Sequence, residues 1–417
     1  MKKVVISGMI GNGLEWYDYA LYGQVIFILA KHFFPAGDET VQMLAAFGVF
    51  AAAFIVRPIG AAFFGWLGDK YGRQPAMVVA ILMMALPTGA IGLLPTYAEI
   101  GIWAPIALTV IRLMQGMSLG GEFSGSIAYI VEHAPAKRRG IAGAASLVSL
   151  KLGFMLGIIV VRGVMEWVGE EAFQEWGWRI PFLLGIVIGL IGFYIRHYCD
   201  ESPIYVEAKQ AENLSPRPIR EAFGSHPWKM AQGFGAYVSV TMPFYLMTVF
   251  FISFMTKHLH ITMSHALDIT LMNLSLMAVA TAMSAHISDY FGRKKVMMTA
   301  AIMCSMTIYP MFAMMQQGMN VEYYMLVQGI FCFMLGCYMG PVATFLVELF
   351  PTPVRFSGMA ISYNLAAALF GGTAPLVCEW LIGATGSYQS LAYYVMLCNL
   401  ISLVALYYYR DRSGAPL

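Results

Sequence analysis

The chain consists largely of apolar blocks of roughly 20 residues that follow one another almost without interruption. Blocks of this length match the hydrocarbon core of a bilayer, whereas a water-soluble protein would alternate polar and apolar faces. Of the 417 residues, 59% are hydrophobic and only 12% are charged. Soluble domains carry about twice that charged share, so the sequence predicts an all-α membrane protein and excludes a water-soluble globule.

Glycines, prolines and charged clusters divide the apolar sequence into twelve candidate spans. These start near residues 9, 41, 75, 102, 140, 178, 228, 265, 295, 322, 356 and 388. The longest polar stretch, residues 199–227, separates six spans from six. We therefore predict an N-terminal six-helix half (1–198), a linker (199–227) and a C-terminal six-helix half (228–417), with both termini on one side of the membrane.

Basic residues lie mostly in the loops on the side of the termini. Only four are expected at the other face, namely Lys31, Arg162, Arg179 and Lys257. The other eighteen basic residues in loops are Lys2, Lys3, Lys70, Arg73, Lys137, Arg138, Arg139, Arg196, Lys209, Arg217, Arg220, Lys229, Arg293, Lys294, Lys295, Arg355, Arg410 and Arg412. By the positive-inside rule, both termini and the linker are predicted to be cytoplasmic.

The sequence lacks the motifs that are typical of several other functional classes. The net charge of +2 and the scattered basic clusters argue against a nucleic-acid partner. No G-x-x-x-x-G-K-[ST] loop occurs, so ATP cannot drive the protein, and no metal motif or C-x-x-C pair suggests a metal or cofactor. We expect no enzyme activity, no cofactor and no metal, and a reliance on an ion gradient.

Two short segments recur across the linker. GWLGDKYGRQP at residues 65–75 matches AHISDYFGRKK at residues 285–295. VEHAPAKRRG, which starts at Val131, matches VELFPTPVRF, which starts at Val347. Each pair occupies the same place between spans, which predicts internal duplication and two pseudo-symmetric halves.

The duplicated G-x-L-x-D-x-x-G-R pattern resembles the hallmark of the major facilitator superfamily. Further segments resemble its metabolite:proton symporter family: GNGLEWYDYALYG (11–23), RPIG (57–60), RLMQGMSLGGEFSG (112–125), WGWRIPF (176–182) and ELFPTPVR (348–355). Within that family, the chain is most similar to proline/betaine carriers and α-ketoglutarate permeases. The resemblance implies a multi-pass inner-membrane carrier that works as a monomer by alternating access, with a small molecule, protons and the lipid bilayer as its partners.

The first copy of the repeat carries a candidate gate. Asp69 and Arg73 are four residues apart, as are Gly68 and Gly72, so one helical face is expected to approach a neighbour closely while its charges pair. The resemblance implies that Asp69 holds the halves together on the cytoplasmic side when the outward-open state forms. The alternative is that these charges only fix topology.

The second copy offers the matching residues Asp289, Gly292 and Arg293. It has Ala285 where the pattern has glycine, which predicts a looser helix approach. Arg139 and Arg355, at matching positions after the fourth and tenth spans, are expected to join the same charge networks.

Charged side chains within spans are the candidates for proton coupling, because each costs at least ~2.5 kcal/mol to insert. Glu15, Asp18 and Tyr22 follow at intervals of three and four residues, which predicts that they face one cavity wall. Glu122 in span 4 is a third candidate carboxylate. The alternative for each carboxylate is a permanent ion pair with Arg57 or Arg112.

Cationic and amide side chains within spans are the candidate substrate ligands. Arg112 and Gln115 share a face, and a guanidinium can hold a carboxylate through two hydrogen bonds. Lys151 in span 5 favours the same carboxylate ligand; its alternative is an internal pair with Glu122 or Asp18. Further candidates are Tyr22, Arg57, which could instead serve the gate, and Tyr245 and Asn364 in the second half.

These features predict a proton-coupled symporter that imports a small carboxylate-bearing metabolite, either an organic acid or a zwitterion such as proline or betaine. One alternative is a drug or metabolite/proton antiporter of the same fold. Such carriers usually have a Gly-Pro-rich signature in span 5, where this chain reads KLGFMLG at residues 151–157, without proline. The other alternative is a transporter-like sensor that does not transport.

Overall fold

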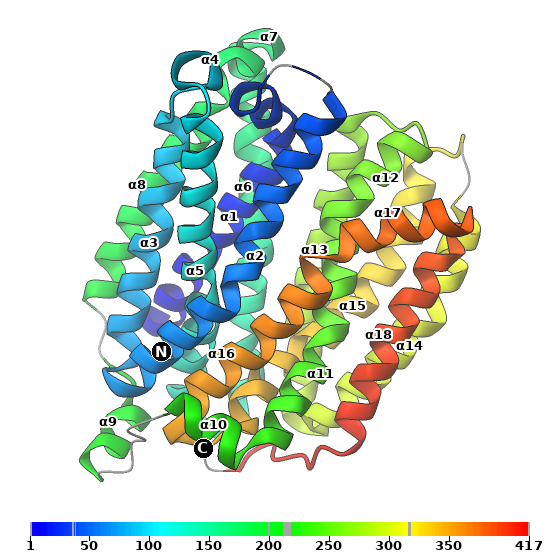
Figure 1. Cartoon of the computed structure of the whole chain (residues 1–417). Coiled ribbons are helices and arrows are strands. Elements are labelled where there is room, and N and C mark those ends of the chain that lie inside the picture. The colour runs from blue at the N-terminus through cyan, green and yellow to red at the C-terminus, as the bar shows by residue number, and fades with distance from the viewer. Residues whose placement is uncertain are drawn as a thin grey trace.

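The computed structural model describes residues 2–35, 37, 39–198, 201–211, 218–315 and 318–415, and every regular element in this part of the chain is a helix (Figure 1). The long helices of the N-terminal half are α1 (Lys2–Phe33), α2 (Glu39–Lys70), α3 (Arg73–Leu93), α5 (Trp103–Glu132), α6 (Arg139–Val168) and α8 (Arg179–His197). Short helices α4 (Tyr97–Ile100) and α7 (Glu170–Ala172) cap one end of this half. The all-α prediction is confirmed.

The C-terminal half repeats this plan with two interrupted helices. Its elements are α11 (Pro227–Tyr245), the π-helical turn Leu246–Phe250, α12 (Phe251–His258), α13 (Met263–Phe291), α14 (Arg293–Met314), α15 (Val321–Leu349), α16 (Arg355–Ala366), the π-helical turn Ala367–Gly371, α17 (Ala374–Thr385) and α18 (Gln389–Tyr407). Counting α11–α12 and α16–α17 as single spans gives six. The two six-helix bundles stand side by side (Figure 1).

The length and apolarity of the helices fit a bilayer. Among the described residues, nine helices are long and apolar enough to cross a membrane. The bent pair Glu170–Gly177 and Arg179–Ile195, with an angle of 61°, makes a tenth if both pieces belong to one span. The two remaining long helices, α1 and α5, contain buried charged side chains that lower their apolarity. With α1 and α5, the described part of the chain has twelve long helices or interrupted helices, the number that the sequence predicts.

The two halves meet along two equivalent seams. On one seam α2 and α5 pack against α16; on the other α6 packs against α13 and α15. Because α2 and α13 carry the two copies of the repeat, the duplication in the sequence becomes a near two-fold arrangement of contacts. Any movement of one half against the other must therefore slide or separate these seams.

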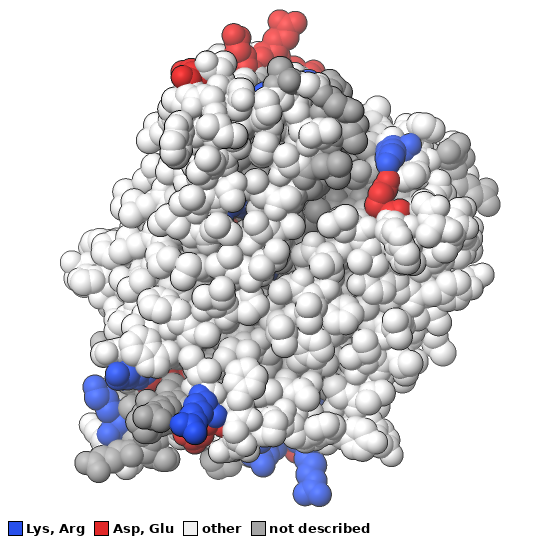
Figure 2. All heavy atoms as spheres, viewed as in Figure 1, with Lys and Arg blue, Asp and Glu red and all other residues white. Residues whose placement is uncertain are grey.

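Charges mark the two ends of the molecule. Short helices α9 (Pro203–Gln210) and α10 (Pro218–Ser225) of the linker lie at the end that also holds the C-terminus, which we call the linker face (Figure 1). Lys and Arg gather near this face together with some acidic side chains, whereas several acidic side chains project from the far end over α4 and α7 (Figure 2). Between these ends the visible surface is almost free of charge, as expected for a surface in contact with lipid.

Candidate functional site

A small cavity lies between the halves, halfway along the long helices. The volume open to the centre of a water molecule is about 20 Å³, so the cavity is narrow. Its lining residues are Glu15, Trp16, Arg57, Phe123, Leu150, Tyr237, Val240, Thr241, Phe244, Tyr245, Met339, Tyr363 and Ala367. Both halves therefore contribute, and six of the thirteen side chains are aromatic.

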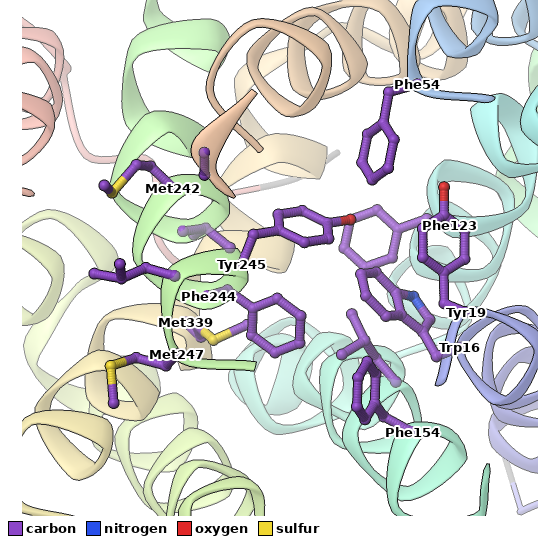
Figure 3. Packing of buried hydrophobic residues seen from close by; sticks show 14 of the residues in the cluster. Trp16, Tyr19, Phe54, Phe123, Phe154, Met242, Phe244, Tyr245, Met247 and Met339 are labelled. Carbon is purple, nitrogen blue, oxygen red and sulfur yellow. The ribbon is translucent and has the colours of Figure 1, made fainter. Parts of the chain in front are cut away.

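Aromatic rings from opposite halves touch across this cavity. Trp16 of α1 meets Phe244 edge to face, with ring centroids 5.3 Å apart, and Phe123 of α5 meets Tyr363 of α16 at 4.8 Å. Figure 3 shows Trp16 and Phe123 facing Phe244 and Tyr245. The faces of such rings attract cations, quaternary ammonium groups in particular.

A buried ion pair lies in the same wall. The Arg57 Nη2 is 3.5 Å from Glu15 Oε1, and both side chains are at most 2% exposed. Arg57 Nη1 also donates to the Tyr245 hydroxyl at 3.2 Å, which links α2 to α11 of the other half. The guanidinium lies 5.0 Å from the centre of the Phe54 ring, so it is held between a carboxylate and aromatic faces.

Three polar atoms in the cavity wall lack a hydrogen-bond partner within the described protein. They are Arg57 Nε, Trp16 Nε1 and Thr241 Oγ1, all buried. Buried polar groups are nearly always hydrogen-bonded, so unpaired ones that line a cavity are suited to hold a polar ligand. The wall thus offers donors for a carboxylate together with aromatic faces and Glu15 for a cation.

Asp18, which we predicted to face the same cavity wall as Glu15, lies instead inside the N-terminal half. Its carboxylate accepts hydrogen bonds from Arg112 (2.6 Å), Gln115 (2.8 Å) and Thr88 (3.0 Å), and all four side chains are fully buried. Residues three apart on an α-helix differ by about 60° around its axis. That rotation turns Asp18 toward α3 and α5 while Glu15 faces the other half.

Tyr22 is also absent from the cavity lining. Its ring lies 4.2 Å from the Arg112 guanidinium, and its hydroxyl donates to the carbonyl of Ala46 at 3.1 Å. Seven residues separate it from Glu15, which is about 10 Å along a helix axis. Arg112, Gln115 and Tyr22 therefore support Asp18 behind the wall in this conformation.

The remaining candidates have different surroundings. Asn364 Nδ2 donates to the carbonyl of Gly120 at 2.8 Å and joins α16 to α5 across the seam. Lys151 is fully buried, but its neighbour Leu150 lines the cavity and Lys151 does not. The side chain of Glu122 lies outside the described residues.

The predicted gate residue Asp69 contacts the other half directly. Its carboxylate accepts from Arg73 Nη1 at 2.7 Å, and from the backbone N–H and hydroxyl of Ser357 at 2.9 and 2.8 Å. The N–H of Phe356 is 3.3 Å away. Because α16 begins at Arg355, Asp69 lies at a helix N-terminus, where unpaired N–H groups and the helix dipole favour an anion.

The second copy forms the equivalent contact with the roles of the halves exchanged. Asp289 accepts from Arg293 Nη1 at 2.8 Å and from the N–H groups of Gly140 and Ile141 at 2.8 and 3.2 Å. These are the second and third N–H groups of α6, which begins at Arg139. Each half therefore places one carboxylate at the start of a helix in the other.

Two carboxylates that our predictions missed complete these clusters. Glu132 pairs with Arg355 of the other half at 2.8 Å and lies 3.5 Å from Arg73. Glu348 pairs with Arg293 at 3.3 Å. The repeat could have predicted both glutamates, because each directly follows the valine that begins its copy of the second recurring segment.

Arg139, expected to join the second cluster, interacts electrostatically with Glu348 of that cluster and donates a hydrogen bond to the carbonyl of Ala415 at 2.6 Å. Its counterpart Arg355 does join the first cluster, through Glu132. The C-terminal segment thus reaches from the C-terminal half to the start of α6.

The glycines of the repeat have two separate roles. A Cβ atom on Gly68 would lie 2.7 Å from the Phe356 ring, so this glycine permits the close approach of α2 and α16. Gly72 does not share that face, because α2 ends at Lys70 and Gly72 has a φ of +124°. Gly292 takes the same place with a φ of +90°, and a side chain would be strained at either position.

The expectation of a looser approach at Ala285 is wrong. A Cβ atom on Gly140 would lie 2.6 Å from the Ala285 carbonyl oxygen, so α13 and α6 are also in close contact. Gly140 corresponds to Phe356 when the segment from Val131 is aligned with the segment from Val347. At the first contact the glycine lies on the helix that carries the aspartate, and at the second it lies on the facing helix. A comparison of the two aspartate loops alone cannot show this difference.

Comparisons with known proteins agree with this architecture. The family model "Sugar (and other) transporter" matches residues 4–221, and the model "Major Facilitator Superfamily" matches residues 233–417. The chain belongs to the major facilitator superfamily, and it is a membrane transporter and not an enzyme.

Its curated relatives narrow this class. The chain is 33% identical to the "Proline/betaine transporter" of Salmonella typhimurium, and 33% identical to the "Glycine betaine/proline/ectoine/pipecolic acid transporter OusA" of Dickeya dadantii. It is 34% identical to the "Ectoine/proline transporter ProP" of Corynebacterium glutamicum. Each match covers all of this chain and 85% of the relative.

Solved structures share the fold at lower identity. The proton:xylose symporter XylE bound to 6-bromo-6-deoxy-D-glucose matches with a TM-score of 0.81 at 17% identity, covering 99% of this chain and 96% of XylE. An inward-open structure of the xylose transporter XylE from E. coli matches with a TM-score of 0.66 at 17% identity, covering 99% and 97% of the two chains.

The Asp18 cluster allows a test of whether Asp18 stabilises the fold or couples transport to protons. Among the described residues, Asp18 is the one carboxylate paired with Arg112. We therefore expect the change Asp18→Asn to cost about 3–5 kcal/mol of stability, because it leaves a buried cation without that partner. Thermal unfolding of the purified protein in detergent measures this loss.

The control is Glu166→Gln, because Glu166 is 68% exposed in its pair with Arg162 and should change stability by less than ~0.5 kcal/mol. If Asp18→Asn unfolds at the wild-type temperature but fails to couple uptake to protons, Asp18 is a coupling residue and not a structural one.

Proposed function

We propose that this protein is a proton-coupled symporter that imports a small zwitterion of the proline/betaine kind across the inner membrane by alternating access. The observation that carries this proposal is the narrow aromatic cavity between the halves, with the Glu15–Arg57 pair in its wall. The names of the relatives, which transport proline, glycine betaine and ectoine, support the same substrate class.

Recognition of a zwitterion would use both ends of the ion pair. The Arg57 Nε–H has no hydrogen-bond partner among the described residues. Arg57 can therefore hold the substrate carboxylate together with the Tyr245 hydroxyl that it already contacts. The substrate cation would then lie against Trp16 and Phe244, next to Glu15. An organic dianion would place negative charge against Glu15 and the electron-rich ring faces, which disfavours it.

Proton coupling follows from the same pair. When a substrate carboxylate binds Arg57, Glu15 shares or loses its cation in a buried site. An unpaired buried carboxylate is costly, so Glu15 would take up a proton as the substrate binds. Asp18 keeps its own partners in this scheme, and the proton and the substrate cross together.

Alternating access would be controlled at the linker face. In this structure the contacts of Asp69 and Asp289 with the opposite half close that face. At the far end, the Arg162–Asp268 pair joins the halves at 2.6 Å on the α6–α13 seam. We place the linker face in the cytoplasm, because the basic residues gather there. Opening to the cytoplasm then requires both aspartates to leave their helix N-termini.

Uptake by purified protein in liposomes tests the transport function. With an inward-directed proton gradient, we expect accumulation of labelled proline or glycine betaine that a protonophore abolishes. α-Ketoglutarate, citrate and shikimate are expected to compete poorly, because they lack a cation for the aromatic wall. Gradient-driven export of cationic dyes without metabolite uptake would contradict the proposal and indicate an antiporter.

Substrate binding depends on Arg57 in this proposal. The change Arg57→Gln removes a charged donor to the substrate carboxylate, and such hydrogen bonds contribute about 1.5–3 kcal/mol. We expect the affinity for proline and glycine betaine to fall roughly ten- to a hundredfold, measured by calorimetry on folded protein. Arg138→Gln, at an exposed arginine near the linker face, serves as the control. Unchanged affinity in Arg57→Gln would exclude this role.

The gate is tested by the change Asp69→Asn. An uncharged amide binds the N-terminus of α16 less strongly and leaves Arg73 with one carboxylate fewer, so we expect uptake to fall at least tenfold while membrane insertion is unchanged. Uptake per amount of inserted protein is the measurement. The matched control is Glu379→Gln, which breaks the exposed pair with Lys257 inside one half. Wild-type uptake by Asp69→Asn would rule out gating.

A further inference from the structure

Lys151 lies on the face of α6 that packs against the C-terminal half. Gly143 and Met155 lie two turns before it and one turn after it on the same side of the helix. A Cβ atom on Gly143 would be 2.4 Å from Thr344 Oγ1 of α15, and the Met155 sulfur accepts from Ser275 of α13 at 3.9 Å. Lys151 is therefore enclosed in the seam between the halves and outside the cavity lining.

The surroundings of the Lys151 ammonium are poor in acceptors. The side chain is fully buried, and its one hydrogen bond within the described protein joins Nζ to the Leu147 carbonyl, one turn back on the same helix, at 3.0 Å. An ammonium group has three N–H donors. A backbone carbonyl can satisfy one of them and leaves the positive charge without a counter-ion.

The helices around α6 offer little to balance that charge. On α1, Glu15 and Asp18 are paired with Arg57 and Arg112. Acidic residues on α13 and α15 occur only toward the helix ends, α8 has none, and α7 and the turn after it lie at the far end. The helices packed against α6 also carry other titratable residues, among them Tyr17, Tyr129, Cys332, Cys337 and Tyr338, and α5 carries Glu122, whose side chain is outside the described residues.

This placement differs from that of five buried arginines. Arg57, Arg73, Arg112, Arg293 and Arg355 each have a carboxylate within 3.5 Å. A buried charge without such a partner is strongly disfavoured, whereas a neutral amine with one hydrogen bond is tolerated. Lysine, unlike arginine, can lose its proton when it is buried.

We propose that Lys151 is a proton-binding group of the seam, neutral while α6 packs against α13 and α15 and protonated when movement of the halves admits water to this face. The proton comes from water and returns to it when the seam closes, so proton binding favours the open seam. This rests on the proposed proton coupling and adds a second proton-binding group, distinct from Glu15, that acts on the conformational change and not on substrate binding.

Two substitutions separate this role from the alternatives. Lys151→Met is permanently neutral and of similar length, so we expect substrate binding and exchange of labelled for unlabelled proline near the wild-type rate. Accumulation driven by a proton gradient should fall at least tenfold. Lys151→Arg is permanently charged and should lose exchange as well as accumulation, because the seam cannot close around it.

Other results would overturn the proposal. If Lys151→Met loses proline affinity while Lys151→Arg keeps it, Lys151 binds the substrate carboxylate. If Lys151→Met accumulates proline like the wild type, Lys151 has only a packing role. If the wild type itself shows no proton-driven uptake, the proposed symport fails, and the proton-binding role is decided by a measurement that does not involve transport.

That measurement is the thermal unfolding temperature of wild type and Lys151→Met between pH 6 and 9. A lysine that is neutral when folded binds a proton on unfolding, so the wild type should gain stability relative to Lys151→Met as the pH rises. A constant difference overturns the proposal. The same trend should persist in a Glu122→Gln background; its disappearance there would show that Glu122 holds Lys151 as a charged pair.

Discussion

The interaction on which this structure depends is a carboxylate of one half bound at the N-terminus of a helix in the other. Asp69 accepts hydrogen bonds from N–H groups in the first turn of α16, and Asp289 accepts them from N–H groups in the first turn of α6. Four N–H groups at a helix start have no partner within the helix, and the helix dipole adds positive potential there. Arg73 and Arg293 hold each carboxylate in place. Because the contact joins separate halves, it can be made or broken as a unit, which suits a gate.

Duplication allows the same contact to be built twice, although the packing around it is not copied residue by residue. At the first contact, Gly68 makes room for the bulky Phe356 of α16; at the second, Gly140 of α6 makes room for the backbone at Ala285. At both seams, one of the two facing helices carries a glycine at the point of closest contact. Close approach of the backbones brings the carboxylates within hydrogen-bonding distance of the helix ends.

The buried charges differ in whether their partners lie in the same half. Asp18 and Arg112 are paired within the N-terminal half, so a rigid-body motion of the halves leaves the pair intact. Glu15 and Arg57 also belong to this half, but they line the cavity, and Arg57 contacts Tyr245 of the other half. Lys151 lies in the seam itself. A motion that separates the halves therefore changes the surroundings of Glu15, Arg57 and Lys151. It leaves the pair of Asp18 and Arg112 unchanged.

The sequence by itself determined the fold class, the duplication and the positions of the aspartate–arginine loops, because span length, repeated segments and i,i+4 spacing can be read along the chain. Only the tertiary structure decided that Glu15 faces the cavity while Asp18 faces α3 and α5, and that Asn364 bridges the halves. It also decided that Glu132 pairs with Arg355, which lies in the other half. Each residue turns a side chain by about 100° around a helix axis, so the partner of a buried charge depends on which helix packs against that side. Periodicity shows that a charge is buried in a span, and helix packing decides what that charge meets.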